Sequence, residues 1–124
     1  MSQRGFSYVE LLLAVALVGT VVMGVVPAFM TCKDANTRND IRSGAAAVAQ
    51  RAMEAERRLD PSDLPGSGSS SLQVVREGER DYEFVVHYCT EPSWCDFDTR
   101  HLMVEVSFGT QTVLVVESVF TKLR

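Results

Sequence analysis

The sequence lacks the motifs on which common hydrolases and phosphate-binding enzymes depend. It contains no Gly-x-Ser-x-Gly, no glycine-rich phosphate loop and no His-Glu-x-x-His. Potential metal ligands are also few, with two histidines and three cysteines. No familiar zinc spacing links His87, Cys89, Cys95, Asp96 and His101. We therefore predict no enzyme, no metal site and no cofactor.

Positive charge is scarce where a nucleic-acid binder would need it. Residues 61–124 carry five basic and ten acidic side chains, whereas residues 32–60 carry six basic and five acidic. Neutralisation of phosphates supplies much of the affinity of proteins for nucleic acids, and it requires a broad basic face. Direct nucleic-acid binding is not expected.

Charge is absent altogether from one long stretch. No residue from Leu11 to Met30 is charged, and a helix of that length spans about 30 Å, the thickness of a bilayer core. The chain can therefore cross a membrane. Directly before this run lies Glu10, an acid that costs about 2.5 kcal/mol or more at bilayer depth and therefore requires a partner.

The residues before the apolar run read RGFSYVE (residues 4–10). This motif resembles the processing site of type IV prepilins and of the pilin-like subunits of type II secretion systems. The resemblance implies that a prepilin peptidase cuts between Gly5 and Phe6 and that Phe6 is N-methylated. It also implies that Glu10 meets the freed amino group of Phe6 in a neighbouring subunit, so that two buried charges become one neutral contact.

The family implies an α+β fold, with a long bent N-terminal helix and a small antiparallel sheet of three or four strands packed on the C-terminal half of that helix. We expect the bend at Pro27, because a proline removes one hydrogen bond and clashes with the preceding turn. The predicted segments are a leader (1–5), a transmembrane or filament-core half-helix (6–31), an amphipathic half-helix (32–60), a loop (61–71) and the sheet of the exported domain (72–124).

Apolar periodicity supports this division. In the amphipathic half-helix, steps of three and four residues predict one stripe that receives the sheet. Its members are Ile41, Ala45, Val48, Ala52, Ala55 and Leu59. Two prolines and a Gly/Ser run predict a mobile loop over 61–71.

Strand patterns fill the rest of the chain. A short strand is predicted over 72–76, and alternation predicts strands over 82–89 and 101–108. Gly109 and Thr110 predict a tight turn before a last strand over 112–120. Residues 113–116 are apolar on both faces, which suggests a central or doubly covered strand.

The cysteines have different environments in this scheme. Cys89 and Cys95 bracket a turn on the exported side, where oxidation is possible, and a disulfide between them is favoured. Cys32 is expected to be a small buried hydrophobe. Trp94, inside the bracketed loop, either contacts a partner or folds down over the edge of the sheet.

Other kinds of N-terminal segment fit less well. A secretory signal peptide has a shorter apolar run, and a lipoprotein anchor would need small residues directly before Cys32. A plain membrane anchor gives no reason for Glu10. The sequence therefore favours a structural subunit, a minor pilin or pseudopilin, and the alternative is a single-pass, membrane-anchored exported binding module that does not polymerise.

The resemblance also implies location and partners. Before assembly the subunit would sit in the bacterial inner membrane with its N-terminus in the cytoplasm, and afterwards in a pilus or pseudopilus. The implied partners are a prepilin peptidase that also methylates, other pilin subunits, an assembly ATPase and its inner-membrane platform. The residues do not distinguish piliation, DNA uptake and protein secretion.

Overall fold

The computed structural model describes residues 7–122. The elements, in chain order, are α1 (Tyr8–Arg57), η1 (Pro61–Asp63), β1 (Gly68–Ser69), β2 (Gln73–Glu77), β3 (Arg80–Tyr88), η2 (Pro92–Trp94), β4 (Thr99–Phe108) and β5 (Gln111–Thr121). The chain divides into two compact units, one ending at Arg38 and the other beginning at Asn39. The second unit contains the sheet and the part of α1 that packs on it.

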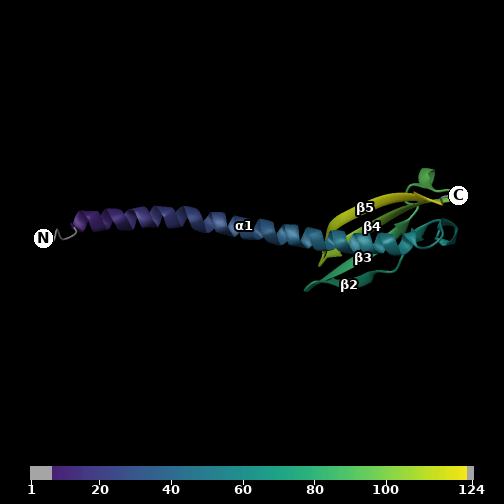
Figure 1. Cartoon of the computed structure of the whole chain (residues 1–124), viewed down its shortest axis with the longest axis horizontal. Coiled ribbons are helices and arrows are strands. Elements are labelled where there is room, and N and C mark those ends of the chain that lie inside the picture. Colours follow the sequence, from purple (N-terminus) through teal and green to yellow (C-terminus); the bar gives the residue numbers. More distant parts are fainter. Residues whose placement is uncertain (1–6, 123–124) are drawn as a thin grey trace. The chain divides into compact units, whose positions relative to one another are not determined.

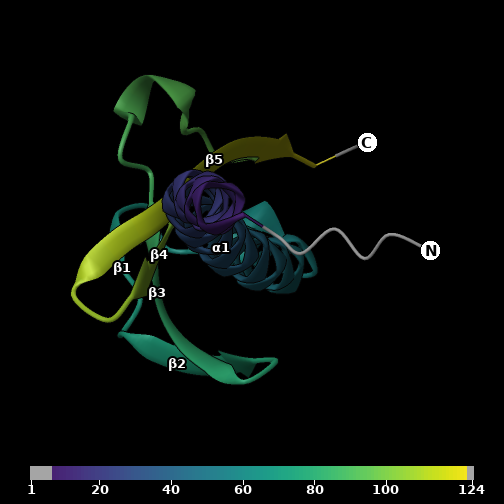
Figure 2. The same cartoon turned by 90° about the vertical axis from the view of Figure 1, so that its left-hand side faces the viewer.

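The described strands form one antiparallel sheet. β3 and β4 are central, β5 pairs with β4 only, and both β1 and β2 pair with β3. Figure 1 shows the C-terminal part of α1 lying across one face of the sheet, and Figure 2 shows the strands curving around it. The α+β fold is therefore as predicted, a single long N-terminal helix packed on an antiparallel sheet, with five strands instead of three or four.

Alternation along the two central strands makes the core. On β3 and β4 every second side chain turns toward the helix and is buried, as the sequence predicts. The buried set is Tyr82, Phe84, Val86 and Tyr88 of β3, Leu102, Val104 and Val106 of β4, and Ala45, Val48, Ala49, Ala52 and Met53 of α1. Small alanines let the helix approach the sheet closely, and burial of each large apolar side chain contributes about 1.5–3 kcal/mol.

The prediction was wrong for the last two residues of the apolar stripe on the helix. Ala55 is exposed, and Leu59 is 52% exposed. Ala49 and Met53 are buried instead, because they lie one turn and two turns after Ala45 on the same face of α1, whereas Ala55 lies at the edge of that face. Leu59 lies beyond the last helical residue, Arg57, and so leaves the helical periodicity altogether.

The segment 61–71 is not the free loop that its composition predicted. Pro61 and Leu64 are buried. Ser70 donates its backbone N–H to the carbonyl of Val86 (2.7 Å), and its hydroxyl accepts from the N–H of Val86 (3.0 Å). The segment therefore packs against the sheet at both of its ends, and its two-residue strand β1 accounts for the additional strand.

The last strand is an edge strand, not a central one. β5 pairs with β4 and with no other described strand. Val113, Leu114 and Val116 pack against the core, whereas Val115 is half exposed. An apolar run on both faces therefore did not indicate burial on both faces here.

Two glycines set the hairpins. Gly78 (φ 63°) begins the two-residue connection between β2 and β3, and Gly109 (φ 62°) begins the one between β4 and β5. A first turn residue with positive φ matches the twist of the flanking strands, and glycine adopts it without steric cost. The tight turn predicted at Gly109 and Thr110 is confirmed.

Candidate functional site

The predicted cleavage site, Gly5 and Phe6, lies outside the described residues, and processing there stays a prediction. Glu10 is described. It lies in the first turn of α1, where the backbone N–H groups of Glu10 and Leu11 both donate to the carbonyl of Ser7 (2.9 and 3.1 Å). The Glu10 side chain is exposed, with no partner among residues 7–122.

The spacing from Ser7 offers a second hypothesis for Glu10, capping of the helix, although no hydrogen bond among the described residues joins the Glu10 side chain to Ser7. Ser7 followed by Glu10 three residues later is the spacing of a helix capping box, and a carboxylate is favoured at the positive end of the helix dipole. The three-residue spacing between Ser7 and Glu10 is visible in the sequence and could have suggested this hypothesis. A capping role and a pairing role make different demands, because capping tolerates a neutral glutamine and pairing with an amine does not.

Within the described part of the first unit, residues 7–38, nothing packs on the helix after Glu10. Its apolar side chains from Val9 to Met30 are exposed, and α1 is long and apolar enough to cross a membrane, by length and composition. Glu10 also lines a shallow hollow on the helix surface with Leu13, Ala14 and Leu17. This surface requires either lipid or other helices to cover it.

Pro27 does not end the helix, because α1 continues without interruption to Arg57. Pro27 has no N–H to donate to the preceding turn. Its own carbonyl accepts from the hydroxyl of Thr31 (2.9 Å). A bend at Pro27 stays a prediction. Cys32, one residue further on, is a free, exposed cysteine, so the expectation that it would be buried was wrong.

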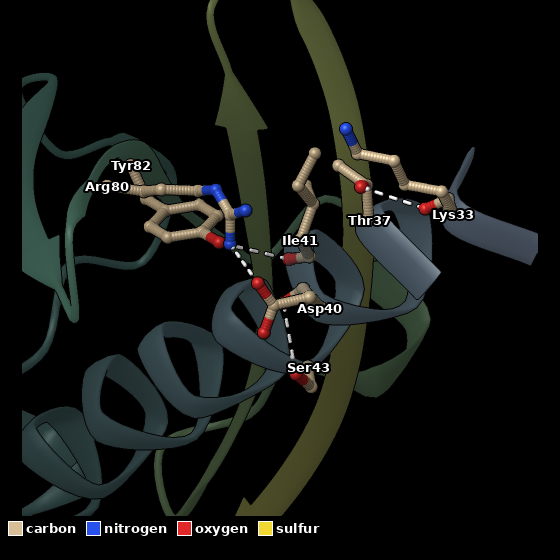
Figure 3. Close-up of polar contacts among 7 residues, drawn as sticks. All are labelled: Lys33, Thr37, Asp40, Ile41, Ser43, Arg80 and Tyr82. Atoms are coloured by element: carbon tan, nitrogen blue, oxygen red, sulfur yellow. Dashed lines mark hydrogen bonds and ion pairs between the residues drawn. The ribbon is translucent and has the colours of Figure 1, made fainter. Parts of the chain in front are cut away.

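A set of polar contacts fastens the β2–β3 hairpin to the start of the helix in the second unit (Figure 3). The Arg80 guanidinium pairs with Asp40, and this hydrogen bond raises the pKa of Arg80. The hydroxyl of Tyr82 donates to the carbonyl of Ile41 (3.2 Å). A second ion pair, between Arg51 and Glu77 (2.6 Å), fastens the other side of the hairpin.

The fit of this hairpin depends on Gly44, a residue that the sequence suggested only as an interruption of the helix. A Cβ at Gly44 would lie 2.3 Å from Oη and 2.8 Å from Cζ of Tyr82. The glycine thus admits the tyrosine ring against the helix. No local sequence pattern reveals this contact, since the two residues belong to different elements.

A disulfide joins Cys89 and Cys95, with the Cα atoms 5.9 Å apart. The closed loop lies over His101, which is 2% exposed. The hydroxyl of Thr90 lies 3.0 Å from Nδ1 of His101. The ring of Trp94 meets the imidazole edge-on, with centroids 5.4 Å apart, while the tryptophan stays 52% exposed. Trp94 therefore folds down over the sheet, as one of the two predicted alternatives has it, and contact of its exposed part with a partner stays a prediction.

The potential metal ligands named from the sequence, His87, Cys89, Cys95, Asp96 and His101, do not form one cluster. Both sulfur atoms of Cys89 and Cys95 are in the disulfide. On the outer face of the sheet, Nε2 of His87 lies 3.7 Å from Oε2 of Glu105, and Nε2 of His101 lies 3.8 Å from Oε2 of Glu117. Within residues 7–122 no three metal-ligating side chains gather at one place.

The C-terminal end of the sheet is joined to the end of the helix by an ion pair between Lys122 and Asp60. The hydrogen bonds from Lys122 and Ser62 lower the pKa of Asp60 from 3.8 to about 2. The same contact raises the pKa of Lys122. Asp60 also caps η1, because its Oδ1 accepts from the backbone N–H of Ser62 (3.2 Å).

Comparisons of this chain with protein-family models, with curated proteins and with solved structures found no match in any of the three.

Proposed function

We propose that this chain is a type IV pilin-like structural subunit, a minor pilin or pseudopilin, that acts by assembly and not by catalysis. The observation that carries the proposal is the acid Glu10, which directly precedes an uncharged and exposed stretch of α1, residues 11–30. The fold is compatible with this role, because the long helix begins with an apolar stretch and its C-terminal part carries a small sheet. The second unit, from Asn39 on, is called the head below.

In the proposed mechanism, a prepilin peptidase cuts between Gly5 and Phe6 and the new N-terminus is methylated. The apolar half of α1 holds the subunit in the inner membrane, with the head exported. On assembly the same apolar surface packs against other helices, so burial stabilises both states and an ATPase with its membrane platform must drive the transfer. Glu10 aligns each incoming subunit by pairing with the amine of Phe6.

Two substitutions separate pairing from capping at Glu10. Glu10→Gln keeps the hydrogen-bonding side chain of a capping box but removes the charge, whereas Glu10→Ala removes both. Filaments sheared from cells and blotted should contain both variants at much lower levels than the wild-type chain, although both are processed. Polymerisation of Glu10→Gln at the wild-type level would show that the acid only caps the helix.

The exposed Trp94 favours the second candidate, an anchored binding module that does not polymerise. The state of the N-terminus distinguishes the two. Mass spectrometry of the protein from its own cells should find N-methylated Phe6 for the pilin-like subunit, and Met1 or Ser2 for the anchored module. Gly5→Val should accumulate as a larger, unprocessed precursor on a gel, and normal processing of that variant would count against the proposal.

A further inference from the structure

His101 is a buried, titratable side chain on the outer face of the sheet, 2% exposed. Its Nδ1 lies 3.0 Å from the hydroxyl of Thr90. Its Nε2 is buried and has no hydrogen-bond partner in the part of the chain that the structure describes. A buried polar atom without a partner costs free energy, so most such atoms in folded proteins are paired.

The segment that lies over this imidazole is the disulfide-closed turn and the residues that follow it, called loop 90–98 below. Thr90 contacts the imidazole at the start of the loop. The ring of Trp94 meets it edge-on, with the two planes at 76°. Sγ of Cys95 accepts from the backbone N–H of His101 (3.4 Å). His101 therefore contacts the loop at both ends of the part that the disulfide closes.

The carboxylate of Glu117 faces the unpaired nitrogen from the neighbouring strand β5. Its Oε2 lies 3.8 Å from Nε2 of His101. This separation is within the range of an ion pair but is too long for a hydrogen bond. Glu117 is largely exposed, with 55% of its side chain accessible, so it is free to move closer.

The other charged groups around the loop have contacts of their own. Glu91 accepts from the hydroxyl of Ser93 (3.0 Å), Asp96 accepts from the N–H of Phe97 (2.7 Å), Arg100 donates to the backbone carbonyls of Asp96 and Thr99, Asp98 lies near Lys122, and His87 lies beside Glu105 (3.7 Å). Glu117 is therefore the carboxylate that the unpaired nitrogen of His101 meets.

The number of protons on the imidazole determines how many of these contacts it can make. A neutral imidazole carries one N–H, whereas an imidazolium donates at both ring nitrogens. With the single proton on Nδ1, a bare Nε2 would face the carboxylate of Glu117, and two acceptors repel. With the proton on Nε2, the neutral N–H lies too far from that carboxylate to bind it. Only the imidazolium can donate to Thr90 and also attract Glu117 by charge, and hydrogen bonds between charged groups are the shorter and stronger ones.

We propose that His101 is a proton-controlled latch on loop 90–98. Protonation draws Glu117 onto Nε2 while Nδ1 donates to Thr90, so that the loop and β5 are held together across β4. Loss of the proton releases Glu117 and loosens the loop. Histidine is the side chain that ordinarily gains or loses its charge between pH 5 and pH 8.

The latch acts on the surface that the loop presents. Trp94 lines a shallow groove with Val119, and Val119 lies directly opposite His101 in the β4–β5 register. Because Trp94 packs against the imidazole, loosening of the loop moves one wall of this groove. The latch lies within the head, so it is independent of the proposed role of Glu10 in assembly.

Trp94 reports the state of the latch, because it is the only tryptophan of the chain and it contacts His101. Acrylamide quenching of its fluorescence is measured on the purified full-length chain in detergent at pH 8 and at pH 5. The bimolecular quenching constant, which is the quenching slope divided by the lifetime without acrylamide, measures how accessible the ring is. It should be about twofold lower at pH 5, since the protonated latch holds the loop against the sheet.

The two histidine–glutamate pairs of the outer face supply matched variants. Glu117→Gln removes the charge beside His101 and should remove most of the response to pH. Glu105→Gln makes the same change beside His87 and should leave the response intact. Both glutamates are partly exposed, so both variants should fold. His101→Gln should likewise abolish the response, and His87→Gln should keep it.

Hydrogen exchange gives a second readout that does not depend on fluorescence. Protection of the backbone amides of loop 90–98, corrected for the intrinsic effect of pH on exchange, should be about tenfold greater at pH 5 than at pH 8, the effect of one hydrogen bond to a charged group. In Glu117→Gln the corrected protection should be nearly equal at the two pH values.

Three results would overturn the latch. The first is a wild-type quenching constant that stays the same or rises on acidification. The second is an equal response in Glu117→Gln and Glu105→Gln, and the third is corrected amide protection that does not change with pH. None of them bears on the proposed function, which a chain that keeps its leader would overturn while leaving the latch intact.

Discussion

Replacing Gly44 by alanine tests how closely the sheet is fitted to the helix. In a helix free of neighbours, Gly→Ala adds about 1 kcal/mol of stability through helix propensity. Here the new Cβ would lie 2.3 Å from Oη of Tyr82 and 2.8 Å from its Cζ. Tyr82 cannot easily withdraw, because it is 1% exposed and its ring packs against Phe108 with centroids 5.5 Å apart.

The expected balance is destabilising. Overpacking of this kind costs about 1–3 kcal/mol, and displacement of Tyr82 also weakens its hydrogen bond to the carbonyl of Ile41, a loss of about 0.5–1.5 kcal/mol. With the gain in helix propensity subtracted, Gly44→Ala should lower the free energy of unfolding by about 1–3 kcal/mol. In a unit of this size, each kcal/mol lowers Tm by about 4–8 °C.

Thermal unfolding of the full-length chain in detergent, followed by the fluorescence of Trp94, measures this change. Tyr82→Phe removes the closest atom, so Gly44→Ala should cost less in that background. Gly24→Ala is the control, since a Cβ there meets nothing within 4 Å, and it should leave the Tm of the head unchanged. Stabilisation by Gly44→Ala, or an equal cost in both backgrounds, would refute the reasoning.

Two further predictions concern the other end of the head. The pKa of Asp60 falls from 3.8 to about 2 on folding, so its contribution to stability is present above pH 3.8 and is lost as the pH falls toward 2. Asp60→Asn should therefore flatten that part of a plot of Tm against pH. An unchanged slope would contradict the ion pair with Lys122. Replacing both Cys89 and Cys95 by serine should lower the free energy of unfolding by about 2 kcal/mol, because the disulfide no longer restricts the unfolded chain around this short loop. Urea titration measures the change, and a value below about 0.5 kcal/mol would contradict a constraining role.

The sequence predicted those parts of the fold that depend on local periodicity. Alternation placed Tyr82, Phe84 and Leu102 correctly in the core, because one face of each central strand meets the helix. Uncharged length identified the apolar half of α1. Strand alternation and the uncharged apolar run are each evident from a short stretch of sequence, so neither depends on contacts with distant segments.

The features that sequence could not predict depend on contacts between distant segments. The run at Val113 looked doubly covered, but strand order places β5 at the edge of the sheet. Burial of Leu64 holds a segment whose composition suggests a mobile loop. Gly44 interrupts a helix pattern only because Tyr82, far along the chain, needs the space. No local pattern carries this information.

The candidate site divides in the same way. Glu10 is evident as the acid directly before an uncharged apolar run, and its spacing from Ser7 makes helix capping a competing hypothesis. Nothing in the sequence indicated that Phe97 is 74% exposed, because an exposed aromatic residue in a turn looks the same in sequence as a buried one.

The central claim is that the carboxylate of Glu10 binds an amine that exists only after cleavage. The most direct test is the mass of the N-terminal peptide of the protein recovered from sheared filaments of its own cells. The account predicts a chain that begins at Phe6 and carries one N-methyl group. A chain that still begins at Met1 or Ser2 would contradict it.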